Sequence, residues 1–345
     1  MKQSTMLSIL LMISFLSVNV VAQDYDHAGG YMDVISKQQE NVSKKYMSYT
    51  SASAHGKRAK KVESLRAKLL DEVQEARMNI SAMPSFNGDK RYRDTAVNFM
   101  KLYYNVLNED FSKIINMEEI AEQSYDDMEA YMMAEEMVDK KLEEANEKMK
   151  LAQSVFAAKN NVTLINDKND LGIMMEQVHK NNIYYHQVYL IFFKPYKQEG
   201  YLMEAIEKNN VTGIEQNKNS LLKYSQEGLT KLRDIKPFDG DNSIASACKE
   251  VLKFYVKEVS EKLSAVSDYF LTKERFEAVK KEFEKKSSPT KQDVENFNKG
   301  VTDINKAANA FSTTNEELNN QRKEVFDSWN KSVGAFFDEH TPHYK

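Results

Sequence analysis

The sequence predicts an all-α protein built from tandem duplicated, up-and-down four-helix bundles with long helices. Three observations predict it: residues that break helices are scarce, apolar residues recur at helical spacing, and the two halves of the chain match in one register. The 345 residues include only 11 Gly and 5 Pro, about half and about a third of ordinary usage. This scarcity argues against a β-sandwich, which needs a turn every few residues.

The first segment, residues 1–22, has the pattern of a secretory signal peptide. Lys2 supplies a positive charge, residues 6–15 form a short apolar run, and Ala22 places a small residue before the expected cleavage site at Gln23. The run is shorter than the roughly 20 apolar residues of a membrane-spanning helix. We therefore expect cleavage between Ala22 and Gln23 and an extracytoplasmic protein, in the periplasm, at the cell surface or secreted.

We expect the mature chain to lack a membrane attachment. A bacterial lipid anchor needs a cysteine at the cleavage site, but the one cysteine is Cys248, and a single cysteine also excludes a disulfide framework. The most apolar later segment, residues 183–193, contains His186 and Gln187. We expect no lipid anchor at this site and no transmembrane helix.

The chain also carries an internal repeat. Several short matches fall in one register without a gap, which indicates an ancient tandem duplication. We predict a first helical bundle repeat over residues 23–163 and a second over residues 164–345. The matches at a shift of 152 positions are Leu69-Leu70 with Leu221-Leu222, Gln74-Glu75 with Gln226-Glu227, Phe86 and Gly88-Asp89 with Phe238 and Gly240-Asp241, and Lys101 and Tyr103 with Lys253 and Tyr255.

Apolar residues three and four positions apart mark the helices. The longest runs go from Met128 to Phe156 and from Val294 to Phe336, and shorter runs cover residues 62–80, 174–192 and 252–270. Such spacing is typical of the seam of a helix bundle or coiled coil. Each half then holds about four helices, enough to enclose a bundle core.

Turns separate these segments at equivalent places in the two halves. Gly88 and Gly240 can take the left-handed conformation that a tight turn needs, and the following Asp89 and Asp241 can cap the next helix. Pro195 marks where the second half departs from the first.

One helix-spaced pair suggests metal chemistry. Glu176 and His179 share a helix face, and His186 follows one heptad later. A ferritin-like di-iron bundle needs two Glu-x-x-His pairs and two further glutamates, whereas this chain has one such pair. We interpret Glu176, His179 and His186 as surface or boundary residues, and we predict no metal and no cofactor.

Two other patterns imitate metal sites. Residues 239–243, with Glu250, resemble a calcium loop, but Ile244 stands where that loop requires glycine, so we predict a turn and a helix cap. A methionine cluster could supply Cu(I) ligands, but methionine at helical spacing is the usual filler of an irregular core. We predict core packing for this cluster, which comprises Met128, Met132, Met133 and Met137.

Polar residues interrupt the apolar seams at four places. Buried polar groups must be paired, and these either fix the helix register or line a ligand cavity. We favour the register for Glu135, Asn181, Asn315 and Arg322. We also predict that Cys248 is a buried thiol and that His340 and His343 belong to a frayed tail.

No enzyme class is indicated by the sequence. The chain lacks a Gly-rich phosphate loop, a nucleophile elbow and a His-Glu-x-x-His motif. Its net charge of -4 removes the bulk electrostatic case for nucleic-acid binding. We therefore predict a protein that is not an enzyme and has no nucleic-acid partner.

Two resemblances bear on function. The expected pair of exported bundles is similar in architecture to imelysin-type iron-regulated proteins, but their Gly-x-His-x-x-Glu signature is absent. The signal segment ending at Gln23, the repeated Phe-x-Gly-Asp turn at Phe86 and Phe238, and the Tyr- and Lys-rich helices resemble an uncharacterised bacterial surface-protein family, first noted in spirochaetes and also present in Bacteroidetes. This resemblance implies export or surface location and implies no reaction.

Together these features predict an exported, non-enzymatic α-helical envelope or surface protein that binds a partner, expected to be another envelope protein, or has a structural role. The alternative is a small-ligand or metal carrier with a polar pocket inside one bundle, near Glu176, His179 and His186. The sequence sets no oligomeric state.

Overall fold

The computed structural model describes residues 26–110, 124–165 and 170–344, and all regular secondary structure within them is helical. This confirms the predicted all-α class. Among the described residues, no helix combines the length and the apolar character that a membrane crossing requires. The predicted signal peptide and its cleavage site at Ala22 and Gln23 lie outside the described residues.

The chain divides into two compact units. Unit 1 comprises residues 1–186 and 334–345, and unit 2 comprises residues 187–333. The division falls inside two long helices, α6 (Asp170–Glu207) and α10 (Lys291–His340). The compact units are defined by contacts in the structure, whereas the predicted repeats are defined by similarity between two parts of the sequence. The units therefore do not test the repeats over residues 23–163 and 164–345, which stay a prediction.

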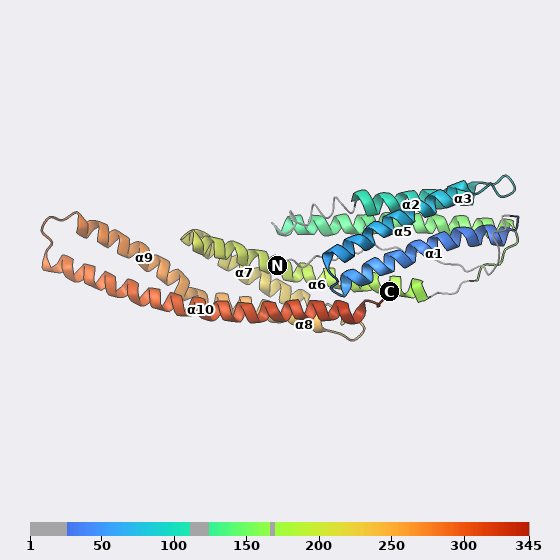
Figure 1. The fold of residues 1–345 in the computed structure, drawn as a ribbon. Helices are drawn as coiled ribbons and strands as arrows, with labels where there is room; N and C mark the ends of the chain where they lie inside the picture. Colours follow the sequence, from blue (N-terminus) through green and yellow to red (C-terminus); the bar gives the residue numbers. More distant parts are fainter. Residues whose placement is uncertain (1–25, 111–123, 166–169, 345) are drawn as a thin grey trace. The chain divides into compact units, whose positions relative to one another are not determined.

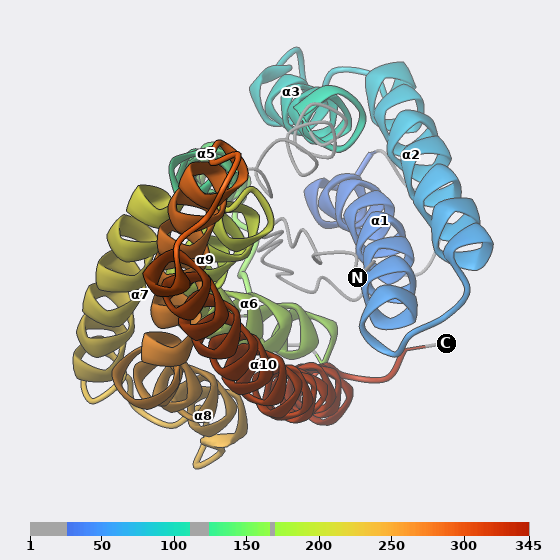
Figure 2. The same cartoon turned by 90° about the vertical axis from the view of Figure 1, so that its left-hand side faces the viewer.

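Unit 1 is a bundle of consecutive helices that pack side by side (Figures 1 and 2). Its core includes an aromatic cluster in which the rings of Tyr31, Phe86 and Phe156 lie 5.3–5.5 Å apart, centroid to centroid. The helices are α1 (Ala28–Ala54), α2 (Ala59–Ala82), α3 (Arg91–Asn105), the π-helix η1 (Val106–Asp110), α5 (Tyr125–Lys159) and the first part of α6.

Unit 2 continues from the second part of α6 and also contains most of α10. At its centre the ring of Phe192 stacks on Trp329, with centroids 4.3 Å apart and planes inclined by 9°. Both side chains are buried, so this stack joins α6 to α10. The other helices are α7 (Val211–Lys231), α8 (Ser243–Lys257), the π-helix η2 (Glu258–Lys262) and α9 (Leu263–Glu284).

The two units share a segment that repeats at a constant offset. The first residues of α3 and α8, Arg91 and Ser243, are 152 positions apart, and so are those of η1 and η2, Val106 and Glu258. The turns before α3 and α8 also match. Each closes with an isolated bridge, from Phe86 to Asp89 or from Phe238 to Asp241.

The backbone conformation of the two turns explains why they need these residues. Gly88 and Gly240 have φ values of 79° and 91°, which glycine adopts without steric cost. In both turns the aspartate accepts a hydrogen bond from the first N–H of the next helix, Arg91 at 3.1 Å or Ser243 at 2.7 Å. The predicted turns are thus confirmed. The cap prediction is off by one position, because the N-cap residues are Lys90 and Asn242, and the aspartates, one position before them, accept from the first helical N–H. Duplication of whole bundles stays a prediction.

Within the described part of unit 2, the ends of α9 and α10 form a two-helix hairpin (Figure 1). Residues 271–317, at the junction of α9 and α10, include no buried residue. Their apolar seam is held by ring contacts such as Phe283 with Phe297, whose centroids are 4.6 Å apart. The prediction that Asn315 is a buried seam residue is wrong, because Asn315 is exposed in this hairpin.

Arg322 joins three elements of unit 2 through a buried ionic cluster. Its Nε donates to Glu199 on α6 at 2.5 Å, and its Nη2 donates to Glu258 on η2 at 2.6 Å. Glu258 is 0% exposed, and its second oxygen, Oε2, is buried without a hydrogen-bond partner among the described residues. Two carboxylates share one guanidinium, so the cluster carries one excess negative charge unless it holds a proton.

The proton belongs on Glu258. Burial, followed by repulsion from Glu199, raises the pKa of Glu258 to about 8. Burial also raises the pKa of Glu199, although Arg322 opposes this effect. At neutral pH the cluster is therefore close to charge balance, with Glu258 mostly protonated.

Two of the four predicted seam polar residues are paired as expected. Besides Arg322, the Asn181 side chain donates to the backbone oxygen of His340 at 2.7 Å, which fixes the end of α10 in unit 1. The side chain of Glu135 lies outside the described residues. The prediction for Cys248 is confirmed, because its thiol is fully buried.

We predict that Glu258→Gln makes the protein more stable at about pH 8 and less sensitive to pH. The folded protein keeps a proton that the unfolded chain releases above its ordinary pKa of 4.5. The contribution of Glu258 to the free energy of unfolding is therefore full below pH 4.5 and is lost as the pH rises to about 8. This loss, on the order of a few kcal/mol, is absent from the variant.

Urea unfolding at about pH 5 and about pH 8 measures the effect. Glu250→Gln is the matched control, because Glu250 lies on the surface of α8 and pairs with Lys253 at 2.7 Å. The control should follow the wild-type pH dependence. Parallel pH profiles for the wild type and Glu258→Gln would contradict the buried proton.

Candidate functional site

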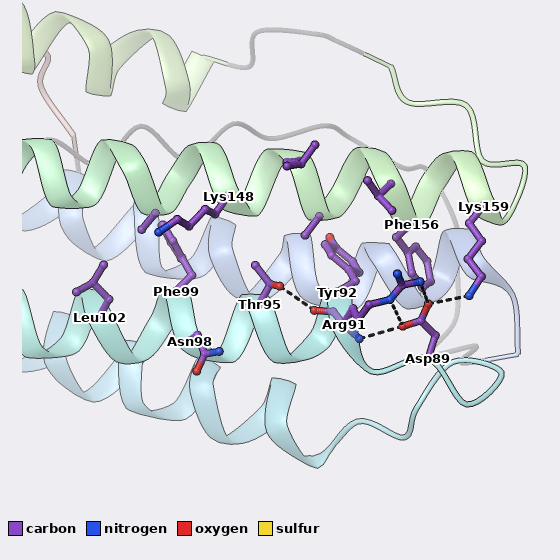
Figure 3. A pocket seen from close by; sticks show the side chains of 14 residues that line it. Asp89, Arg91, Tyr92, Thr95, Asn98, Phe99, Leu102, Lys148, Phe156 and Lys159 are labelled. Carbon is purple, nitrogen blue, oxygen red and sulfur yellow. Dashed lines mark hydrogen bonds and ion pairs between the residues drawn. The ribbon is translucent and has the colours of Figure 1, made fainter.

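The candidate site is an open groove in unit 1 between α3 and α5, with a volume of about 540 Å³ (Figure 3). The turn before α3 closes one end of it, beside the last turn of α5. Because α3 and α5 pack directly against each other, the groove follows the line along which their side chains meet.

The groove has an apolar floor and an apolar stretch on the side formed by α5. Phe99 from α3 and Phe156 from α5 lie at its base and are buried. Leu151 and Val155 line the side formed by α5, yet they are 65% and 47% exposed. Full burial of a Leu or Val side chain contributes about 1.5–3 kcal/mol of favourable free energy. A partner that covers this surface would therefore gain binding free energy.

A charged cluster forms one end of the groove. Asp89 accepts hydrogen bonds from Arg91 Nη2 at 2.6 Å and from Lys159 Nζ at 2.8 Å, and these contacts tie the turn to the end of α5 (Figure 3). The bonds from Arg91 and Lys159 hold the pKa of Asp89 well below its usual range. Two cations face one carboxylate, which leaves this end of the groove with a net positive charge.

A further cation, Lys148, lies farther along α5, where its side chain extends toward the α3 side of the groove (Figure 3). Among the described residues it has no hydrogen bond or ion pair. Its ammonium group is therefore available to an anionic group that enters the groove.

The residues singled out by the sequence lie elsewhere in unit 1, on α6. Glu176 pairs with Lys180, with Nζ 2.9 Å from the carboxylate oxygen. Burial lowers the pKa of His179, and burial lowers the pKa of His186 to about 4. Both imidazoles are therefore neutral at pH 7. In the described part of the chain, these three residues do not form a group that could hold a metal ion.

The predicted core packing of the methionine cluster holds for half of it. Met128 and Met132 are buried, but Met133 and Met137 are exposed. The prediction is wrong for the exposed pair, because they project from the opposite side of α5.

Sequence reasoning missed the groove because its most exposed apolar residues fall outside the seam of α5. That seam buries Met149 and Phe156, whereas Leu151 and Val155 form a second apolar stripe, four positions apart. A second stripe on a helix that is already packed on one side is the signal that could have indicated this surface.

No protein-family model, no curated protein and no solved structure matches this chain. The fold and the groove define a general class: an all-α protein with an open apolar groove between two helices and basic groups at its edge.

We predict that Asp89→Ala destabilises the protein more than Asp94→Ala does. Both changes remove one carboxylate near the start of α3, but Asp89 bonds the Arg91 N–H and also links Lys159 to the turn. Asp94 pairs with its neighbour Arg93 on the surface. Hydrogen bonds to charged groups support a difference of about 1–2 kcal/mol in the free energy of unfolding.

Urea unfolding at neutral pH measures the difference. Because the pKa of Asp89 is lowered, its contribution is present above its ordinary pKa of 3.8 and is lost as the pH falls below it. The gap between the two variants should therefore close in acid. Equal midpoints for both variants at neutral pH would show that the link between α3 and α5 contributes nothing.

Proposed function

We propose that this protein is an exported, non-enzymatic binding module, and that the groove between α3 and α5 receives an amphipathic helical segment of a protein partner. The observation that carries the proposal is the exposed apolar wall of the groove, formed by Leu151 and Val155. The partner is expected to be another envelope protein.

The form of the groove favours a helical occupant. It is open along two packed helices, and a third helix can lie over such a line with apolar residues spaced at i, i+3, i+4 and i+7. Its apolar residues would cover Leu151 and Val155 and continue the packing that α3 and α5 already make with each other.

The charges at the groove indicate the flanks of the partner segment. Lys148 and the cluster of Arg91, Lys159 and Asp89 present net positive charge on a chain whose net charge is -4. Acidic residues beside the apolar stripe of the partner complement these cations. Such pairs contribute more to orientation and association rate than to affinity.

The groove chemistry supports a binding role rather than a catalytic one. Its lining residues include no histidine or cysteine, and the one carboxylate, Asp89, is engaged by two cations. A general base or nucleophile would need a free group at this place. Export rests on the signal segment at residues 1–22.

The alternative, a small-ligand carrier, draws support from the volume of the groove. About 540 Å³ lies within the range of roughly 300–1,000 Å³ that small-molecule sites occupy. A single-chain amphiphile with an anionic head group would contact the same cations, Lys148, Lys159 and Arg91. It would therefore compete with a helical peptide for the groove.

We predict that Leu151→Glu abolishes binding of helical peptides at this groove. Peptides are selected from a display library of amphipathic helices with acidic flanks against the mature chain, and their affinities are measured by fluorescence anisotropy. Burying a new carboxylate against an apolar peptide face weakens binding by at least about tenfold. Lys148→Glu slows association, and this effect shrinks at high salt.

Met78→Glu is the matched control, because Met78 is an equally exposed apolar residue (60%) on α2 that does not line the groove. It should bind the selected peptides like the wild type. If no peptide is enriched, or if the selected peptides bind Leu151→Glu as well as the wild type, the proposed function is wrong. Displacement of the peptide by an anionic amphiphile such as dodecanoate would favour the carrier.

A further inference from the structure

A second cluster in unit 1 brings together side chains far apart in the sequence. His55 follows the last residue of α1, Asp338 lies in the last turns of α10, and His343 follows that helix. One potential ligand atom from each residue lies within 4.8 Å of the other two. The cluster is separate from the groove, whose lining residues come from α3, α5 and the turn before α3.

The contacts within this cluster are specific. His55 Nδ1 and Asp338 Oδ1 are 2.8 Å apart, and the rings of His55 and His343 stack with centroids 3.7 Å apart. The bond to His55 lowers the pKa of Asp338. This contact orients the His55 ring.

A buried nitrogen points to a missing ligand. The His55 side chain is 6% exposed, and its Nε2 is buried without a hydrogen-bond partner among the described residues. Leaving a buried polar atom unpaired costs about 1–3 kcal/mol. A metal ion satisfies this nitrogen, because neutral imidazole is a common metal ligand and its other nitrogen is then held by a carboxylate.

The chain holds this arrangement in place through neighbouring contacts. The backbone N–H of Tyr344 donates to Ser51 Oγ on α1 at 2.9 Å. Asn181 donates to the backbone oxygen of His340 at 2.7 Å, and Thr341 is buried. The end of α10 and the residues after it are therefore docked on unit 1, contrary to the prediction that His340 and His343 belong to a frayed tail.

We propose that His55 Nε2 and His343 bind a divalent transition metal of the zinc type, while Asp338 holds the other ring nitrogen of His55, and that the ion fastens the segment after α10 to the end of α1. Two imidazole nitrogens match the donors that Zn²⁺ prefers, with water molecules completing a tetrahedral set, and a ligating histidine commonly has its other nitrogen held by a carboxylate. Asp338 and His343 are solvent-exposed, so the ion can reach the site without unfolding of the bundle.

Calorimetric titration of the chelator-treated mature chain with ZnCl₂ tests this site. We expect one bound Zn²⁺ per chain, and at least about tenfold weaker binding for His343→Ala and for Asp338→Asn. His179→Ala is the control, because His179 lies on α6 outside the cluster, and it should bind like the wild type.

A second measurement separates a metal clamp from adventitious surface binding. Zinc should slow carboxypeptidase digestion of the segment after α10 in the wild type and not in His343→Ala, an exposed substitution that leaves the buried His55 in place. No zinc uptake, or uptake and protection that His343→Ala does not change, would overturn the site. Neither outcome bears on peptide binding at the groove between α3 and α5.

Discussion

The apolar seam on each long helix has to be shielded from water by another helix. The rest of the structure depends on which parts of each seam a neighbouring helix buries. In unit 1 consecutive helices cover one another, and the seam residues of α2, such as Leu69 and Ile80, are fully buried. Where α3 meets α5 the cover ends and apolar side chains remain in water. In the hairpin of α9 and α10, no residue of 271–317 is buried. The fold and the candidate groove are therefore results of the same requirement.

The two equivalent π-helices show how one backbone pattern accommodates different chemistry. At the start of η1 stands the buried, apolar Val106, which needs no partner. At the start of η2 stands Glu258, which is equally buried and requires both Arg322 and a proton. Replacing such a cluster by apolar residues is often neutral or stabilising, whereas removing one member leaves a buried charge that costs about 3–5 kcal/mol. The cluster links α6, η2 and α10 in unit 2, and its energetic role is to avoid an unpaired buried charge rather than to add stability.

The sequence predicted those features that depend on local spacing. The helical class, the turns that include Gly88 and Gly240, and the pairing of Arg322 follow from period, backbone conformation and the cost of a buried charge. The π-helices were not predicted, because widening of one helical turn has no residue signature. The exposure of Asn315 and Met133, the groove beside Leu151 and the meeting of His55 with His343 depend on which helices become neighbours. That information lies in contacts between residues far apart in the chain.

The burial of a residue decides whether its role can be tested independently of folding. Substitutions of exposed residues such as Leu151 and His343 usually change the free energy of unfolding by less than about 0.5 kcal/mol, so a change in peptide or zinc binding can be assigned to the site itself. Glu258 and Arg322 are different, because every substitution there alters both a buried charge and the packing of α6 and α10. A pH profile resolves this cluster where a single stability measurement does not, since loss of packing shifts the whole profile and loss of the buried proton changes its slope.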